Sequence, residues 1–316
     1  MKTNLLISIF LLLGLSSCKI SNSSSFNSNS SISNSTIQEE KNNNIDVIIL
    51  TGQSNAEGHT WNNELFKNVE KAQAKQYIDG YDNVKIRFNC NNGLNYCKDF
   101  QSVKLGYGLS TNQFGPEIGI AEYLNDVHEF LNNDVYIIKY AVGGTSLYSD
   151  WRSPSSSTNN TQIGKLYTNL INYIDESIDL LKKQDLVPSI KAICFMQGES
   201  DSTSIGSSVY EELEDNFIKD IKNHIETTQN EIVQFIDAGI SDCPNWSQYY
   251  KIINQAKKNN VLKDSTNRYY FDTVDAKLEY RYEPTSNPDI NHYDSLSMIE
   301  LGKLFSKTLF ENAIIK

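Results

Sequence analysis

Residues 45–58 read IDVIILTGQSNAEG, an apolar run that passes directly into a polar turn. The near-continuous hydrophobic run Ile45–Leu50 is typical of a strand in a parallel sheet that is covered on both faces. In open α/β sheets, ligands bind beyond the carboxyl ends of such strands. The segment therefore predicts a buried strand that carries Ser54 to the edge of a sheet where active sites form.

Five further apolar runs and four segments with helical spacing follow along the chain. The runs are Val84–Phe88, Val135–Tyr140, Ile190–Met196, Ile232–Ile236 and Arg268–Phe271. The segments that predict helices are Pro116–Leu131, Ile163–Lys183, Val209–Ile225 and Ser295–Phe310. Strands that alternate with helices indicate an α/β fold, a three-layer α/β/α sandwich with a central parallel sheet. We expect one such domain over residues 45–316.

The N-terminus has the features of an export signal. A short charged start precedes the apolar stretch Leu5–Leu15, which is too short to span a bilayer as a permanent helix. It leads into Leu15-Ser16-Ser17-Cys18, which resembles the lipobox of bacterial lipoproteins and predicts lipidation at Cys18 after removal of a signal peptide, residues 1–18. An ordinary cleaved signal with a chance cysteine is the alternative. Residues 19–44 are rich in Ser and Asn, as in a flexible tether. These features predict an exported lipoprotein, held on the bacterial cell envelope by a lipid anchor alone.

The charge and the cysteines limit the possible partners. The formal net charge is −11 and the pI is near 4.9, which argues against nucleic acid and other anionic polymers. Cys90 and Cys97 flank a turn signal and permit a small disulfide-closed loop in an exported protein. No cysteine pair has the spacing of a zinc site, so we expect neither a metal nor a cofactor.

Polar motifs follow three of the predicted strands and a fourth precedes the last predicted helix, and each allows more than one interpretation. Ser54 can be a nucleophile at a helix N-terminus or only a helix cap. The pair Gly143-Gly144 can admit a ligand close to the backbone or form a plain turn. Residues 197–201, QGESD, can be a polar loop or a carboxylate pair for a cation. Asp289 lies three residues before His292, close enough to orient its ring, although a surface histidine is the alternative.

Taken together, these motifs resemble the SGNH-hydrolase superfamily and, more narrowly, the sialate O-acetylesterase and plant-type carbohydrate acetylesterase family. The resemblance extends from Ile45 to about Phe305. The matching blocks are Gly52-Gln53-Ser54-Asn55-Ala56, Phe114-Gly115-Pro116-Glu117, Gly143-Gly144-Thr145-Ser146-Leu147, Gln197-Gly198-Glu199-Ser200-Asp201 and Asp289-x-x-His292.

The resemblance implies a catalytic triad and an oxyanion hole. Ser54 would attack the acetyl carbonyl, His292 would act as the base, and Asp289 would orient His292. The donors of the oxyanion hole would be the backbone N–H groups of Ser54 and Gly144 and the side-chain amide of Gln197, where the wider superfamily usually has an asparagine. His59 lies near Ser54 in the chain, but we find no carboxylate to pair with it, so His292 is the expected base.

Four further residues are candidate substrate contacts: Gln53, Asn55, Trp151 and Glu199. Trp151 can either stack on a sugar ring or cover the core. Glu199 has no proton to donate at neutral pH, so it is expected to brace its loop by accepting hydrogen bonds from nearby backbone.

The implied function is a serine esterase that removes acetyl groups from carbohydrates, either acetylated sialic acid or an acetylated polysaccharide. Two alternatives stay open. One is a lipase- or thioesterase-like enzyme of the same superfamily, although its third oxyanion donor would more often be asparagine. The other is a carbohydrate-binding lipoprotein without turnover, which would have no need of a nucleophile, a base and an orienting carboxylate.

Overall fold

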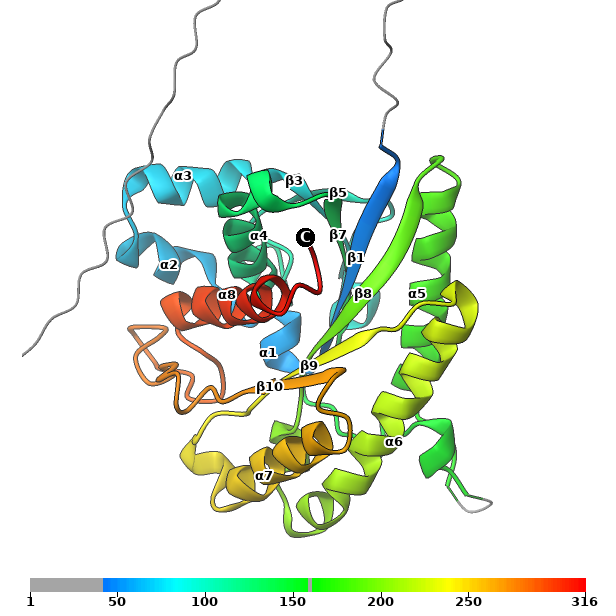
Figure 1. The fold of residues 1–316 in the computed structure, drawn as a ribbon. Helices are drawn as coiled ribbons and strands as arrows, with labels where there is room; N and C mark the ends of the chain where they lie inside the picture. The colour runs from blue at the N-terminus through cyan, green and yellow to red at the C-terminus, as the bar shows by residue number, and fades with distance from the viewer. Residues whose placement is uncertain (1–41, 159–160) are drawn as a thin grey trace, which may run out of the picture. The chain divides into compact units, whose positions relative to one another are not determined.

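The computed structural model describes residues 42–158 and 161–316, which fold around one eight-stranded sheet (Figure 1). The predicted signal peptide with Cys18, and the predicted tether as far as residue 41, lie outside the described residues. The strand order is β10-β9-β8-β1-β7-β3-β4, and β5 pairs with β3. The strands are β1 (Asn44–Gly52), β3 (Tyr81–Cys90), β4 (Asn95–Tyr96), β5 (Gln101–Val103), β7 (Asp134–Ala141), β8 (Val187–Met196), β9 (Gln234–Ala238) and β10 (Arg268–Phe271).

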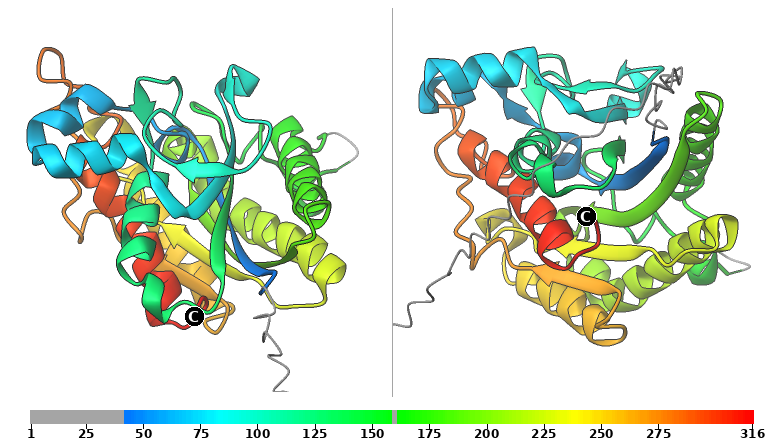
Figure 2. Two further views of the ribbon diagram at one scale, coloured as in Figure 1. Left: turned by 90° about the horizontal axis from the view of Figure 1, so that it is seen from above. Right: turned by 45° about the horizontal axis from the view of Figure 1, so that its top comes forward.

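The sheet is parallel from β10 to β3, as predicted, whereas the short edge strands β4 and β5 run antiparallel to β3 and were not predicted. Helices cover both faces, which confirms the α/β fold. The helices α5 and α6 lie on one face and α4 and α8 on the other (Figures 1 and 2). The helices are α1 (Ser54–Glu57), α2 (Asn62–Asn68), α3 (Lys71–Asp79), α4 (Glu117–Asp126), α5 (Lys165–Lys182), α6 (Ser204–Gln229), α7 (Tyr249–Leu262) and α8 (Ser295–Glu311).

The centre of the sheet is β1, whose apolar run is entirely inaccessible from Val47 to Leu50. This strand pairs in parallel with β7 on one side and with β8 on the other. In that register Gly52, the last residue of β1, lies opposite Ala141 of β7 and Met196 of β8. Because three neighbouring strands end at the same level, the polar segments that come after them meet at one edge of the sheet.

The last helix is held against the sheet by a close crossing with α4. A side chain added at Gly119 would overlap the carbonyl oxygen of Ile299, and one added at Gly302 would overlap that of Pro116. Two glycines at this crossing therefore let the backbones of α4 and α8 touch. The crossing sets the position of α8, and with it the loop that carries Asp289 and His292.

The sequence left open whether Cys90 and Cys97 form a disulfide, and in the structure both cysteines are free. The register of β3 with β4 explains the result. It places Asn95 opposite Cys90, whereas the N–H of Cys97 bonds to the carbonyl of Phe88. The Cys90 thiol is buried against the carbonyl groups of Glu57 and Tyr107.

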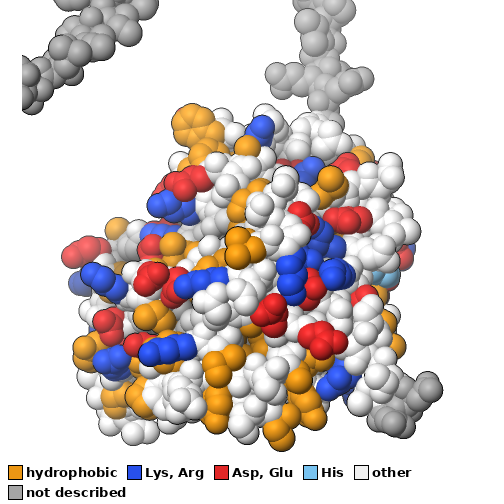
Figure 3. Space-filling view, turned by 60° about the horizontal axis from the view of Figure 1, so that its bottom comes forward, with side chains coloured by type: hydrophobic (Ala, Val, Ile, Leu, Met, Phe, Trp, Pro, Cys, Tyr) orange, Lys and Arg blue, Asp and Glu red, His pale blue; other side chains and the backbone are white. Residues whose placement is uncertain are grey.

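Lysine, arginine and carboxylate side chains are interspersed with apolar ones on the face seen in Figure 3. Among the described residues, none of the helices is both long and apolar enough to cross a membrane.

Candidate active site

Four segments meet at the carboxyl edge of the sheet and bring together the predicted catalytic residues. Ser54 opens the four-residue helix α1 directly after β1. The Gly143-Gly144 turn follows β7, and the QGESD segment, residues 197–201, follows β8. The fourth segment is the loop before α8, which carries Asp289 and His292.

Asp289 and His292 form a hydrogen-bonded pair in the loop before α8. Oδ2 of Asp289 lies 2.6 Å from Nδ1 of His292, and a turn between the two residues is closed by the backbone bond from His292 N–H to the Asp289 carbonyl. The hydrogen bond from His292 holds the pKa of Asp289 below its ordinary value, although partial burial opposes this. An ionised carboxylate only accepts hydrogen bonds, so Nδ1 carries the proton and Nε2 is left free to act as a base.

The chain neighbours of Ser54 and His292 are bonded to each other. The side chain of Asn55 accepts from the N–H of Tyr293 at 3.3 Å and donates to the carbonyl of Asn291 at 3.5 Å. Ser54 itself is 6 % exposed, and its hydroxyl has no hydrogen-bond partner within residues 42–158 and 161–316. The site therefore holds a serine with an uncommitted hydroxyl beside the loop of His292.

Two backbone N–H groups are available to stabilise an oxyanion. Neither Ser54 N–H nor Gly144 N–H has an acceptor among the residues that the structure describes. Gly144 is exposed and has open space on the side where a Cβ would lie. Its neighbour Gly143 differs, because its N–H donates to Glu57 at 2.9 Å. Both N–H groups are placed as their predicted role in an oxyanion hole requires. The role itself stays a prediction.

The predicted third donor, the side-chain amide of Gln197, is committed elsewhere. Gln197 is fully buried, and its Nε2 donates to Asp201 at 2.6 Å and to the carbonyl of Thr145 at 3.2 Å. Both amide hydrogens are therefore used within the protein. Asp201 in turn accepts from the N–H groups of Leu147 and Tyr148. In this structure Gln197 braces the loop after Gly144 and presents no donor to a substrate.

The candidate substrate contacts are also turned inward. Gln53 Oε1 accepts from the N–H of Ser200 at 3.1 Å, and Glu199 Oε1 accepts from Asn55 Nδ2 at 2.8 Å. Gln53, Asn55 and Glu199 are each no more than 3 % exposed. Glu199 thus braces its loop, as expected, and the side chain that it accepts from is that of Asn55. The two carboxylates of the QGESD segment point to different partners.

Of the two interpretations of Trp151, the structure shows the one in which the residue covers the core. The side chain is fully buried, its indole N–H donates to Thr145 Oγ1 at 2.8 Å, and its ring meets that of Tyr140 edge-on. A ring without exposed surface cannot stack on a sugar. The expectation that Trp151 contacts substrate is therefore wrong for this structure.

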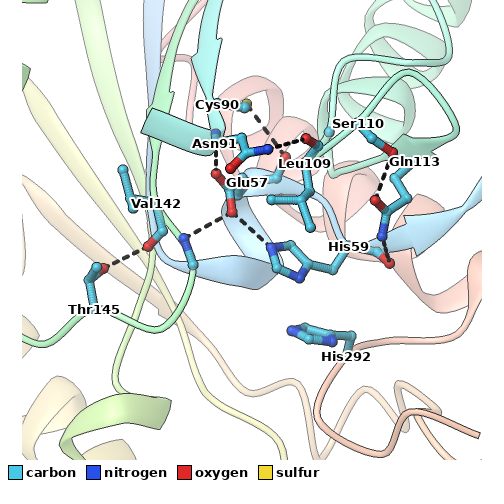
Figure 4. Close-up of polar contacts among 12 residues, drawn as sticks. Glu57, His59, Cys90, Asn91, Leu109, Ser110, Gln113, Val142, Thr145 and His292 are labelled. Atoms are coloured by element: carbon cyan, nitrogen blue, oxygen red, sulfur yellow. Dashed lines mark hydrogen bonds and ion pairs between the residues drawn. The ribbon is translucent and has the colours of Figure 1, made fainter. Parts of the chain in front are cut away.

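A second imidazole–carboxylate pair lies beside His292 and was not predicted from the sequence. His59 Nε2 lies 2.8 Å from Glu57 Oε2, and the ring of His59 lies 4.4 Å from that of His292, measured between ring centroids. Figure 4 shows His59 between Glu57 and His292. The expectation that no carboxylate pairs with His59 is therefore wrong. The signal was present as a glutamate two residues before the histidine, a spacing at which two side chains do not face each other on a regular helix.

Glu199→Gln tests the burial of the Glu199 carboxyl group. Burial raises the pKa of Glu199 above its ordinary value of 4.5, so folding takes up a proton at pH values between the unfolded and the folded pKa. The wild type should gain stability relative to the variant, which cannot titrate, as the pH falls through this interval. Urea denaturation of both proteins from about pH 8 to about pH 5 measures this difference. A difference that does not change with pH, or that changes in the opposite direction, would contradict the assignment.

Solved structures share this fold. A protein from Arabidopsis thaliana superposes with a TM-score of 0.56 at 17 % identity, over 84 % of this chain and 98 % of that one. NanS superposes with a TM-score of 0.57 at 14 % identity, over 85 % and 98 %. A carbohydrate acetylesterase from Xanthomonas citri gives 0.53 at 13 % identity, over 85 % of this chain and 56 % of the other. At these identities the likeness is one of fold.

The family is shown by the sequence itself. No curated protein matches the chain. The sequence profile described as "Carbohydrate esterase, sialic acid-specific acetylesterase" matches residues 44–311, nearly all of the described domain. The chain therefore belongs to this carbohydrate esterase family and is a carboxylic ester hydrolase.

Proposed function

We propose that the enzyme hydrolyses O-acetyl esters on carbohydrates through an acyl-enzyme formed on Ser54. The observation that carries the proposal is the Asp289–His292 pair, joined at 2.6 Å on a loop that is bonded to the residue next to Ser54. This arrangement supports a site in which Ser54 is the nucleophile, His292 the base and Asp289 the orienting carboxylate.

The reaction would proceed in two displacements. In the first, Ser54 Oγ attacks the acetyl carbonyl carbon while His292 Nε2 takes the hydroxyl proton. The negative charge on the carbonyl oxygen is stabilised by the N–H groups of Ser54 and Gly144. The C–O bond to the sugar then breaks, and the sugar oxygen receives the proton from His292. In the second, His292 deprotonates a water that attacks the acetyl-serine, and acetate leaves as Ser54 regains its proton.

An exposed aromatic side chain beside the base supports a sugar as the alcohol part of the ester. Trp61 is 39 % exposed and lines the same small depression as Asp289 and His292. An aromatic ring with one exposed face can bind a sugar by stacking flat against the apolar face of the sugar ring. Trp61 thus takes the role that the sequence suggested for Trp151.

Ser54→Ala and Asp289→Asn test the mechanism. We expect Ser54→Ala to abolish acetate release, with a loss of at least about 10⁴-fold, because no nucleophile remains. Asp289→Asn should lower kcat by roughly 10² to 10⁴-fold with little change in KM, because His292 loses the acceptor that fixes its tautomer. The substrates are 4-nitrophenyl acetate, 4-nitrophenyl octanoate, O-acetylated sialic acid and acetylated xylan.

The panel also separates the alternatives. Serine-dependent acetate release from an acetylated sugar supports the proposal and begins to name the substrate. Activity on the octanoate alone would indicate a lipase-like enzyme. Binding of a sugar without any turnover would indicate the carbohydrate-binding protein. Acetate release that persists at the wild-type rate in a folded Ser54→Ala variant would rule out Ser54 as the nucleophile.

Trp61→Ala tests the sugar contact. Loss of one stacking interaction of about 1 kcal/mol should raise KM for an acetylated oligosaccharide roughly fivefold. The KM for ethyl acetate should stay the same, because the alcohol part of that ester has no ring to stack. Phe66→Ala is a matched control, since Phe66 is similarly exposed (40 %) but does not line the depression. Equal effects of both substitutions, or equal effects on both esters, would argue against this contact.

We also propose, from the sequence, that the protein is exported and anchored to the bacterial envelope through lipid on Cys18. Acyl chains on this residue would hold the enzyme at a membrane surface without a spanning helix. On expression in a bacterium, the full chain should then partition into detergent and take up a labelled fatty acid, and Cys18→Ala should do neither. Ser17→Ala is the control that keeps the cysteine. A wild-type chain that carries no label would contradict the anchor.

A further inference from the structure

The carboxylate of Glu57 joins three segments of the site. Its Oε1 accepts the N–H of Asn91, at the end of β3, at 2.5 Å. Its Oε2 accepts the N–H of Gly143, after β7, at 2.9 Å, and also contacts His59 Nε2 at 2.8 Å. Figure 4 shows these three contacts around the carboxylate. Glu57 lies on α1, three residues after Ser54, so it links the nucleophile's own helix to the ends of two other strands.

The contacts define the charge of Glu57 and the tautomer of His59. Burial disfavours the ionised form of Glu57, but the hydrogen bonds from His59, Asn91 and Gly143 outweigh it and hold the pKa of Glu57 below its ordinary value. Glu57 is therefore an anion at neutral pH, with a side chain that is 1 % exposed. A carboxylate only accepts hydrogen bonds, so His59 Nε2 must carry a proton.

The ring of His59 lies between the ring of His292 and Gly143. Its ring centroid lies 4.4 Å from that of His292, with an angle of 33° between the planes. On the other side, a side chain added at Gly143 would come within 2.9 Å of His59 Nε2 and of Glu57 Oε2. The main chain of His59 is held as well, since Gln113 Nε2 donates to its carbonyl at 2.8 Å. The ring of His59 therefore has little freedom, and it limits where the ring of His292 can lie.

We propose that Glu57 is a positioning residue for both halves of the catalytic centre. Through His59 it holds the ring of His292 in place, and through Gly143 N–H it sets the peptide that precedes the N–H of Gly144. This inference rests on the proposed function, because it assigns Glu57 a part in the same esterase reaction. The adjacent carboxylates Glu199 and Asp201 brace their loops through other partners and make no contact with His59.

Glu57→Gln is the test, because the amide keeps the shape of the side chain but has only one oxygen. The carboxylate uses both of its oxygens to accept from its three donors. If that oxygen faces Gly143, the N–H of Asn91 meets an NH₂ group; if it faces Asn91, the N–H of Gly143 does. A misplacement of about 1 Å in a catalytic group can cost on the order of 100-fold in rate. We expect kcat for 4-nitrophenyl acetate to fall roughly 10- to 100-fold while KM changes less than about threefold.

Glu64→Gln is the matched control. Glu64 is likewise a buried glutamate, 4 % exposed, on the neighbouring helix α2. It accepts hydrogen bonds from Lys67 and Thr285 and contacts neither His59 nor Gly143. Thermal unfolding of both variants shows how much stability each substitution removes. A general effect of losing a buried carboxylate would lower kcat in both variants, whereas positioning by Glu57 lowers it in Glu57→Gln alone.

A second pair of variants tests the contact from Glu57 through His59 to His292, which we call the histidine arm. Its readout includes an NMR measurement that does not depend on activity. His59→Ala removes the ring that faces His292, whereas His59→Phe keeps a flat ring and leaves the Gly143–Glu57 bond intact. We expect His59→Phe to retain more of the wild-type kcat than His59→Ala. The ring signals of His292 in an NMR spectrum should move in Glu57→Gln and in His59→Ala, and stay in place in Glu64→Gln.

The outcomes separate the two claims. A wild-type enzyme with serine-dependent activity, together with a folded Glu57→Gln variant that has unchanged kcat and unchanged His292 signals, overturns this inference alone. A loss of kcat in Glu57→Gln without any shift of the His292 signals, and with equal activity of His59→Ala and the wild type, overturns the histidine arm. A wild-type chain without esterase activity overturns the proposed function and this inference with it.

Discussion

The parallel pairing of β1 with β7 and β8 is the constraint on which the site depends. Gly52 lies opposite Ala141 and Met196, so three strands end at the same level. The residues just beyond these ends, Ser54, Gly144 and Gln197, meet for that reason and not because any of them attracts another. A shift of β1 by one residue would turn its side chains to the opposite face and separate Ser54 from the glycine turn.

Beyond the strand ends, the loops are held by buried acids and amides. Asp201 accepts two backbone N–H groups of the loop after Gly144, Glu199 holds Asn55, and Asn55 holds the backbone on both sides of His292. Burial raises the pKa values of Asp201 and Glu199, which shows that keeping these carboxylates ionised inside the protein lowers its stability. Such a network specifies one arrangement of the loops, because each buried group has few partners that satisfy it.

The sequence predicted the elements that depend on local pattern. The six apolar runs correspond to the six parallel strands, although β9 begins two residues later than expected. The motifs at the strand ends were found for the same reason, since each buried strand carries the next few residues to the edge of the sheet. The directions of individual side chains were not predictable in this way. The amide of Gln197 and the indole of Trp151 both donate a hydrogen bond to Thr145, which pattern alone does not reveal. The pair Glu57–His59 was missed because its geometry depends on the ends of β3 and β7.

The exposed fractions of Asp289 and Glu57 show why the ring of His292 needs a second contact besides Asp289. The side chain of Asp289 is 43 % exposed, whereas that of Glu57 is 1 % exposed and accepts three donors. A pair open to water is screened and holds its geometry weakly, while a buried carboxylate with fixed backbone donors does not move without breaking them. Asp289 selects the tautomer of His292 but is poorly placed to hold the ring alone. The rigid contact on the other side of the ring is His59, and His59 is fixed by Glu57.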